Sequence, residues 1–182
     1  MLQIKLNPFP VLRTNRFMLR QITVADAPAI LTLRSDERTM QYIGKEKIAS
    51  IAEARRFIHM ITQALQENQG ITWGIYLPGQ DNQIGNLGFW RIVKEHHRAE
   101  LGYMLHPDYW RQGIMSEALT AILNYGFTQM RLHSIEANVA PNNIASVKLL
   151  EKHNFVREGY FRENYYVRGT FQDTATYSLL RP

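Results

Sequence analysis

The segment Trp110-Arg111-Gln112-Gly113-Ile114-Met115-Ser116-Glu117 has the spacing that most directly predicts chemistry. A tight turn with a glycine stands there between a segment of strand-like alternation and a segment of helical spacing. The first N–H groups of a helix have no partner within the helix and point along the positive end of its dipole, so they can bind a diphosphate without dedicated lysines. The segment therefore predicts an anion site, although a glycine before a helix also fits an ordinary turn.

Other reactive groups are few in this chain. It contains no cysteine, which excludes disulfides, thiolate zinc sites and a cysteine nucleophile, and fits a reducing compartment. His96 and His97 are adjacent, but neighbours on a strand point to opposite faces and no acidic cluster joins them, so a hairpin turn is the preferred interpretation. We therefore expect no metal, and catalysis must use oxygen or nitrogen groups.

Length and composition indicate one folded domain over residues 1–182, with 45% apolar and 20% charged residues. No apolar run approaches the roughly 20 residues needed to cross a bilayer, and no secretory signal begins the chain, so we expect a cytoplasmic protein without a membrane partner. The net charge is +5, but the basic residues are scattered and their longest run is Arg55-Arg56. Direct nucleic-acid binding is therefore not expected.

The elements around the turn can be predicted from hydrophobic spacing and turn signals. Strands are expected at residues 17–23, 71–77, 84–93, 98–105, 133–139, 155–161 and 174–180. Helices are expected from Thr23 with Asp26, from Ser50 with Glu53, from Met115 to Gly126, and around residues 146–150. Strands and helices interleave, while a hairpin at residues 78–82 and the closing strands favour antiparallel pairing, so we expect a mixed α/β domain.

Two further expectations concern the ends of the chain and its aromatic residues. Residues 1 to about 12 are expected to be the loosest part. Aromatic side chains could stack on single-stranded nucleic acid, but we expect Trp73, Trp90, Tyr165 and Tyr166 to pack in the core instead.

With its flanks, the turn resembles the GCN5-related N-acetyltransferase (GNAT) superfamily, whose signature is Gln or Arg, two residues, Gly, one residue, then Gly or Ala; Gly113 matches the central glycine. The resemblance is closer to the ribosomal-protein-alanine N-acetyltransferase branch. Its motifs here are Leu19-Arg20, Glu100-Leu101-Gly102-Tyr103, His106-Pro107-Asp108-Tyr109-Trp110, Ser116-Glu117-Ala118-Leu119, Asn143-Ile144-Ala145-Ser146, Leu150-Glu151-Lys152 and residues 169–173.

The resemblance implies a mixed, mostly antiparallel twisted sheet with flanking helices and two parallel strands that splay apart to admit acetyl coenzyme A. The diphosphate would bind on the turn formed by Arg111, Gln112, Gly113, Ile114, Met115 and Ser116, and Trp110 would be a further coenzyme-binding residue. The backbone of Met104 and Leu105 would hold the pantetheine arm, and an N–H near Met104 would stabilise the oxyanion. Asn138 would close the splay, and Asn143 would cap the next helix beside the coenzyme.

The chain departs from the pattern at four positions. Trp110 replaces the usual Gln or Arg, and Met115 stands where a Gly or Ala is common and could crowd the diphosphate. Leu150 occupies the place where many members have the tyrosine that protonates the leaving thiolate, and Asn154 replaces a glycine. The usual tyrosine acid is therefore missing from its place.

Amine acetylation requires a neutral nitrogen, so a carboxylate acting directly or through water is the expected general base. Glu100 is the candidate, because it lies on an otherwise apolar strand and resembles the glutamate that several superfamily members use as base. The alternative is a solvated carboxylate on an edge strand.

The proton for the thiolate could come from Ser146, at the position where this branch is suspected to use a serine. Tyr165 or Tyr166 is an alternative donor. Ser146 could instead satisfy local backbone groups in the first turn of its helix.

The resemblance implies that the acceptor would be a primary amine, and a ribosomal or other protein N-terminus is the first expectation. An antibiotic, polyamine or amino-acid acceptor, and a non-catalytic module that binds coenzyme A or RNA, stay open as alternatives. The sequence does not determine the oligomeric state, and a homodimer is compatible with it.

Overall fold

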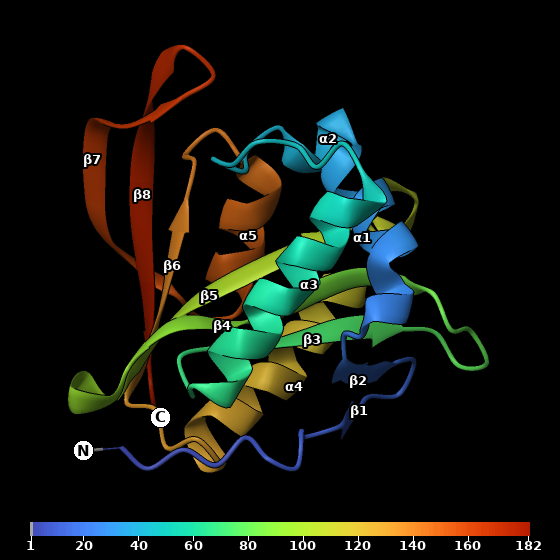
Figure 1. Ribbon diagram of the computed structural model, residues 1–182. Helices are drawn as coiled ribbons and strands as arrows, with labels where there is room; N and C mark the ends of the chain where they lie inside the picture. The colour runs from blue at the N-terminus through green and yellow to red at the C-terminus, as the bar shows by residue number, and fades with distance from the viewer. Residues whose placement is uncertain (1) are drawn as a thin grey trace.

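The computed structural model describes residues 2–182, and over these residues the strands form one eight-stranded sheet (Figure 1). Its order is β1 (Leu12–Arg13), β2 (Met18–Gln21), β3 (Ile71–Tyr76), β4 (Gln83–Val93), β5 (Arg98–Leu105), β6 (Ser134–Val139), β8 (Thr170–Leu180) and β7 (Val156–Val167). All neighbouring strands are antiparallel except β5 and β6, which are parallel. The expected mixed, mostly antiparallel sheet is confirmed.

The parallel pair splays, as the resemblance implied. Only three residue pairs join β5 to β6, from Arg98 opposite Ser134 to Glu100 opposite Glu136. Beyond them β5 continues to Leu105 and β6 to Val139 without pairing to each other. The facing edges of the two strands are therefore open for about the last half of each strand.

The helices fall into two groups. The α-helices are α1 (Ala27–Ser35), α2 (Glu37–Met40), α3 (Ile51–Gln66), α4 (Ile114–Thr128) and α5 (Ile144–Lys152), and 3-10 turns lie at Val24–Asp26, Lys94–His96 and Pro107–Tyr109. α1 and α3 share a hydrophobic cluster with each other, whereas α4 and Leu150 of α5 pack in the main core with alternate residues of the central strands. Glu100, Gly102 and Met104 lie on the sheet face opposite that core.

Two helix starts form as their sequence signals predict. The Ser50 hydroxyl accepts a hydrogen bond from the Glu53 N–H at 3.2 Å, and the Glu53 carboxylate accepts one from the Ala49 N–H at 2.8 Å. At the first helical segment, the Asp26 carboxylate accepts a hydrogen bond from the Thr23 N–H at 2.7 Å. These bonds satisfy N–H groups that a helix start leaves unpaired.

Residues 2–12 pack against the rest of the domain, which corrects the expectation that this segment is the loosest part; residue 1 lies outside the described residues. Leu2 and Leu6 are buried in the main core, and the Leu2 N–H donates to the Lys94 carbonyl at 3.2 Å. The Trp73 indole, fully buried, donates to the Pro10 carbonyl at 2.7 Å. Apolar contacts across the sheet therefore anchor a segment whose local sequence carries no regular periodicity.

The closing hairpin is longer than expected and exposes its aromatic residues. β7 and β8 pair to Val167 and Thr170, and their tip projects beyond the rest of the sheet (Figure 1). Tyr165 and Tyr166 are exposed, as is Trp90, so the expectation that they pack in the core is wrong; for Trp73 it is confirmed. An outer strand such as β7 has no further strand beside it, and its side chains need not be covered.

The turn at the adjacent histidines is confirmed, because His97 adopts a left-handed conformation after the 3-10 turn that joins β4 to β5. No group of three or more potential metal ligands occurs among residues 2–182. Within the same range, no helix combines the length and apolarity that crossing a membrane requires.

Candidate active site

The turn before α4 has the geometry of an anion site. Gly113 is the N-cap residue, with a φ of 72°, and the first helical hydrogen bond runs from the Glu117 N–H to the Gly113 carbonyl at 3.1 Å. The N–H groups of Ile114, Met115 and Ser116 have no partner among residues 2–182. A row of free donors at the positive end of a 15-residue helix fits a diphosphate.

The Met115 side chain, whose size led to the expectation that it could crowd the diphosphate, packs in the hydrophobic core. It is only 9% exposed and belongs to the main hydrophobic core, as does Ile114. These two residues therefore offer main-chain N–H groups to a ligand, while their side chains hold the helix against the sheet.

Ser116 faces a partner that the sequence did not indicate. Its hydroxyl lies 3.0 Å from Nε2 of His153, at the end of α5. Burial, and secondarily the neighbouring charge of Lys152, lowers the pKa of His153 below its ordinary value. A neutral imidazole thus connects α5 to the start of α4.

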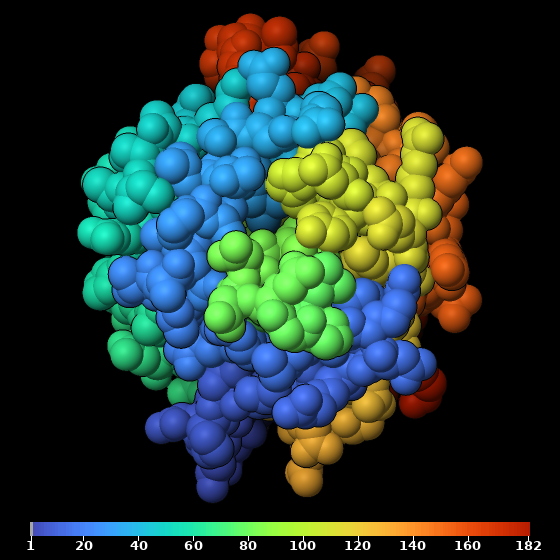
Figure 2. Space-filling model, turned by 90° about the vertical axis from the view of Figure 1, so that its right-hand side faces the viewer, coloured from blue at the N-terminus to red at the C-terminus, as the bar shows by residue number. Residues whose placement is uncertain are grey.

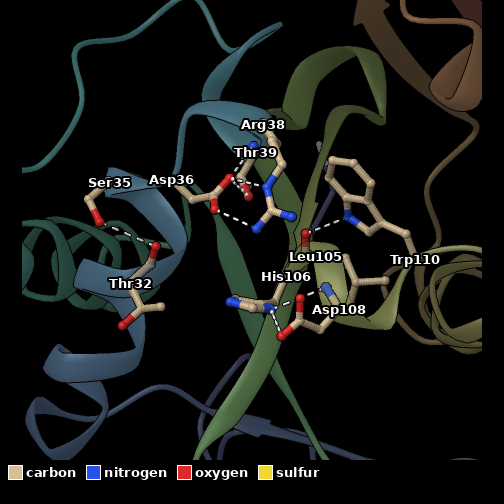
Figure 3. Close-up of polar contacts among 9 residues, drawn as sticks. All are labelled: Thr32, Ser35, Asp36, Arg38, Thr39, Leu105, His106, Asp108 and Trp110. Atoms are coloured by element: carbon tan, nitrogen blue, oxygen red, sulfur yellow. Dashed lines mark hydrogen bonds and ion pairs between the residues drawn. The ribbon is translucent and has the colours of Figure 1, made fainter.

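Two side chains of the segment before α4 form hydrogen bonds to nearby main-chain carbonyl groups. The Trp110 indole donates to the Leu105 carbonyl at 2.8 Å (Figure 3), and the Gln112 amide donates to the Asp108 carbonyl at 2.9 Å. Arg111 precedes the glycine in a left-handed conformation, with a φ of 58°. Trp110 thus supports the chain between β5 and α4 rather than supplying the polar side chain that the signature has there.

A hollow opens beside the connection from β5 to α4 (Figure 2). It encloses about 360 Å³ between α1, the turn of the β3–β4 hairpin and the segment His106–Tyr109. Asp36 and Arg38 at the start of α2 lie across from His106 and Asp108 in Figure 3. The Arg38 hydrogen bond, with that of the Thr39 N–H, lowers the pKa of Asp36 to about 2, so Asp36 caps α2 as a carboxylate.

Glu100 is buried in the centre of the sheet. It is 7% exposed and stands at the last residue pair before β5 and β6 separate, so the alternative of a solvated edge carboxylate is wrong. Nη2 of Arg91 donates to Oε2 at 2.6 Å, and Nδ2 of Asn138 donates to Oε1 at 3.1 Å. The carboxylate is thereby held in one orientation, and each oxygen keeps a further lone pair.

Asn138 lies on β6 in the open part of the strand pair, where the resemblance placed it. Its amide also donates to Glu136 at 2.9 Å, and its carbonyl oxygen accepts from the Thr176 hydroxyl at 2.7 Å. Asn138 therefore links β6, β8 and Glu100 beside the splay.

Ser146 on α5 contacts Tyr103 on the part of β5 that has no β6 partner. The two hydroxyl groups form a short hydrogen bond between α5 and β5, and Ser146 is 8% exposed. Burial raises the pKa of Tyr103 to about 12, although the Ser146 hydrogen bond opposes this shift. The hydroxyl of Ser146 thus bonds to another side chain, while its N–H donates to the Asn143 cap at 3.2 Å, as predicted for Asn143.

Of the remaining predicted site residues, Met104 and Leu105 lie where β5 and β6 separate, and Tyr165 lies in the β7–β8 hairpin. Met104 and Leu105 lie on the part of β5 that has no β6 partner, with their side chains buried. The Tyr165 hydroxyl donates to the Gly44 carbonyl at 2.7 Å, and so anchors the hairpin to the segment after α2 instead of joining Glu100 and Ser146.

Besides His153, three residues of this region were not singled out from the sequence. Tyr103 belongs to the family motif Glu100-Leu101-Gly102-Tyr103, which could have marked it as a site residue. The alternation of apolar residues along its strand indicated only a position in the core. Arg91 and Arg16 carried no such signal. Arg16 contacts Glu117, which is 101 residues away in the sequence.

Comparison with known proteins agrees with this geometry. The family described as "Acetyltransferase (GNAT) domain" matches residues 16–156. The chain is 40% identical over 174 residues to the uncharacterized N-acetyltransferase YoaA of Bacillus subtilis, covering 96% of this chain and 98% of the relative. A GNAT-family acetyltransferase structure from Bacillus anthracis superposes with a TM-score of 0.83 at 29% identity, covering 94% and 99% of the two chains.

Relatives with a named acceptor differ from one another. The chain is 30% identical to the [ribosomal protein uS5]-alanine N-acetyltransferase of Escherichia coli, over 68% of this chain and 64% of that one. It is 26% identical to the spermidine N(1)-acetyltransferase of Vibrio cholerae, over 92% and 94%. The matches thus agree on the transferred group and differ on the amine.

Proposed function

Because the chain belongs to the GNAT family of acetyltransferases, with acetyl coenzyme A as co-substrate, we propose that it acetylates the α-amino group of a peptide or protein. N-acetyltransferase activity follows from membership of the family. The acceptor and the roles of individual residues form the proposal.

One observation carries the assignment of roles: Glu100 and Ser146 lie at two ends of the same opening between β5 and β6. Glu100 is the last paired residue of β5, and Tyr103, which bonds to Ser146, lies three residues further along the open part. A base and an acid on either side of one gap can serve a single transfer without a covalent enzyme intermediate.

Two proton movements complete the reaction. Bound in the gap, acetyl coenzyme A supplies an activated acetyl carbonyl; a nitrogen–carbon bond forms and the carbon–sulfur bond breaks. Glu100 accepts the proton that the amine nitrogen loses, directly or through a water molecule. Ser146 donates a proton to the departing sulfur, and solvent restores both groups afterwards.

Tyr103 supports Ser146 in this role. With its pKa raised to about 12, Tyr103 stays protonated near neutral pH and can donate to the Ser146 oxygen. The Ser146 proton is then free to point toward the sulfur. Tyr103 acts here as a positioning residue.

The charges near Glu100 favour a monoamine over a polycation. Glu100 has an ion pair with Arg91 at 2.6 Å, and Glu136 has one with Arg98 at 3.6 Å, so both carboxylates have a cationic partner. A polyamine would have to compete with these arginines and with a net charge of +5. A terminal α-amino group has a pKa of about 8, so a substantial fraction is neutral without help from a strong base.

Thiol release with an acceptor panel tests the proposal. The panel contains short peptides that begin with alanine or serine, the same peptides with blocked N-termini, lysine and spermidine. We expect turnover with the free peptides alone, with the acetyl group found by mass spectrometry on the terminal nitrogen. If only spermidine or lysine were acetylated, the proposal that the acceptor is a peptide α-amino group would be wrong.

Glu100→Gln tests the base in the same assay. The variant keeps the size of the side chain and removes its proton-accepting charge, so we expect kcat/KM to fall by roughly 100-fold or more across pH 6 to 9. An unchanged rate over this range would remove Glu100 from the mechanism.

A further inference from the structure

Arg16 lies against the turn that precedes α4, although it comes from the opposite end of the sequence. Its Nε donates to Oε2 of Glu117 at 2.7 Å, and its backbone N–H donates to Oε1 at 3.1 Å. Its Nη1 donates to the Gln112 carbonyl at 2.9 Å. One residue therefore holds the turn on both sides of Gly113.

These contacts determine which groups of the turn remain free. Arg16 binds the Gln112 carbonyl, which fixes the peptide plane that leads into Gly113. Glu117 is fixed in the first turn of α4: burial would raise the pKa of its carboxyl, but the hydrogen bonds from Arg16 help to hold that pKa below its ordinary value. The N–H groups of residues 114–116 are left as the unpaired row described above.

One nitrogen of the guanidinium is still available. A Cβ built on Gly113 would lie 3.5 Å from Nη2 of Arg16, so Nη2 lies beside the glycine of the turn. Nη2 has no hydrogen-bond partner among residues 2–182, and the side chain is 48% exposed. A guanidinium binds phosphate oxygens with a planar fork of donors and a permanent charge.

The turn lacks another residue of this kind at the position where its signature has Gln or Arg. Trp110 stands there, and its indole is bonded to the Leu105 carbonyl. Arg16 therefore adds a second guanidinium beside the turn, next to that of exposed Arg111, and compensates for the polar residue missing at position 110.

We infer that Arg16 is a coenzyme-site residue: it positions the turn at residues 112–117, and its Nη2 binds the diphosphate of coenzyme A. The inference rests on acetyl coenzyme A being the co-substrate, and it does not depend on which amine is acetylated.

Calorimetric titration of the full-length protein with coenzyme A, without an acceptor, measures this contribution. A hydrogen bond to a charged group contributes enough that Arg16→Ala should weaken binding by about 10- to 100-fold. Arg16→Lys should recover part of the loss, because lysine restores the charge but not the fork. Arg13→Ala is the matched control, since Arg13 is exposed on β1 and its side chain has no hydrogen bond or ion pair among the described residues.

Truncated ligands separate the diphosphate from the rest of the coenzyme. Arg16→Ala should weaken coenzyme A and 3′-dephospho-coenzyme A by the same factor, and leave the affinity for pantetheine, measured by competition, unchanged. Loss of affinity only for coenzyme A would assign Arg16 to the 3′-phosphate and overturn the diphosphate assignment.

Three other results would overturn the inference as a whole. If Arg16→Ala weakened the binding of pantetheine as much as that of coenzyme A, Arg16 would only maintain the fold. If Arg13→Ala weakened coenzyme A binding as much as Arg16→Ala, the effect would come from net charge alone. If Arg16→Ala left the affinity for coenzyme A unchanged, Arg16 would have no role in binding. A wild-type protein that binds coenzyme A but acetylates no peptide would contradict the proposed acceptor and leave this inference intact.

Discussion

Asn138 donates a hydrogen bond to Glu100 across the point where β5 and β6 separate, with 3.1 Å between Nδ2 and Oε1. The two residues are 38 positions apart, and the bond exists because the parallel register places Glu100 opposite Glu136, two residues before Asn138. The candidate base is thus oriented by the strand that forms the other wall of the coenzyme gap.

Asn138→Ala should lower kcat/KM by about 10-fold, because a hydrogen bond to a charged group contributes about 1.5–3 kcal/mol. Steady-state kinetics over pH 6 to 9 measures the effect. The matched control is Asn124→Ala, at an exposed position of α4 remote in sequence from the splay. A rate equal to that of the wild type would show that Glu100 does not need this contact.

Ser146→Ala should reduce kcat by about 100-fold, the lower end of the range for general acid–base catalysis, and Tyr103→Phe should reduce it less. Since both act on one proton, the double variant should be no slower than Ser146→Ala. Tyr103 has a pKa of about 12, so Tyr103→Phe should leave the ionisations seen below pH 10 in place. Additive losses in the double variant would mean that the two hydroxyl groups work independently.

Met115→Ala should destabilise the protein without weakening coenzyme binding. Truncating a buried methionine typically costs about 2–5 kcal/mol in the free energy of unfolding, and the Met115 side chain is packed in the core behind the turn. Urea unfolding and coenzyme titration provide the two measurements. Tighter binding by the variant would show that the side chain obstructs the diphosphate after all.

The burial of His153 predicts how stability depends on pH. Its pKa is lowered in the folded protein, so the unfolded chain binds more protons as the pH falls through about 6.5, and the free energy of unfolding should fall with it. His153→Asn should make stability less dependent on pH between 5 and 7, measured by urea unfolding. His133→Asn, at an exposed position, should leave the dependence as it is in the wild type; equal flattening by both variants would contradict the prediction.

Local sequence determined the elements whose stabilising bonds close within a few residues. Ser50 caps the helix that contains Glu53, Asn143 caps the helix that contains Ser146, and Gly113 lies in a tight turn before a helix, all as expected from their neighbours. Alternation of apolar residues also indicated the central strands. Such signals can be read from sequence because both partners of each bond lie within one turn or one strand.

Tertiary structure alone decided how those elements combine. The partners Tyr103 and Ser146 are 43 residues apart, and Arg16 and Glu117 are 101 residues apart. Leu2 and Leu6 became core residues, and Tyr165 and Tyr166 became surface residues, according to which strands lie at the centre and the edge of the sheet. Burial and long-range hydrogen bonding depend on the order and register of strands, and those arise from the packing of the whole chain rather than from the conformational preference of any one segment.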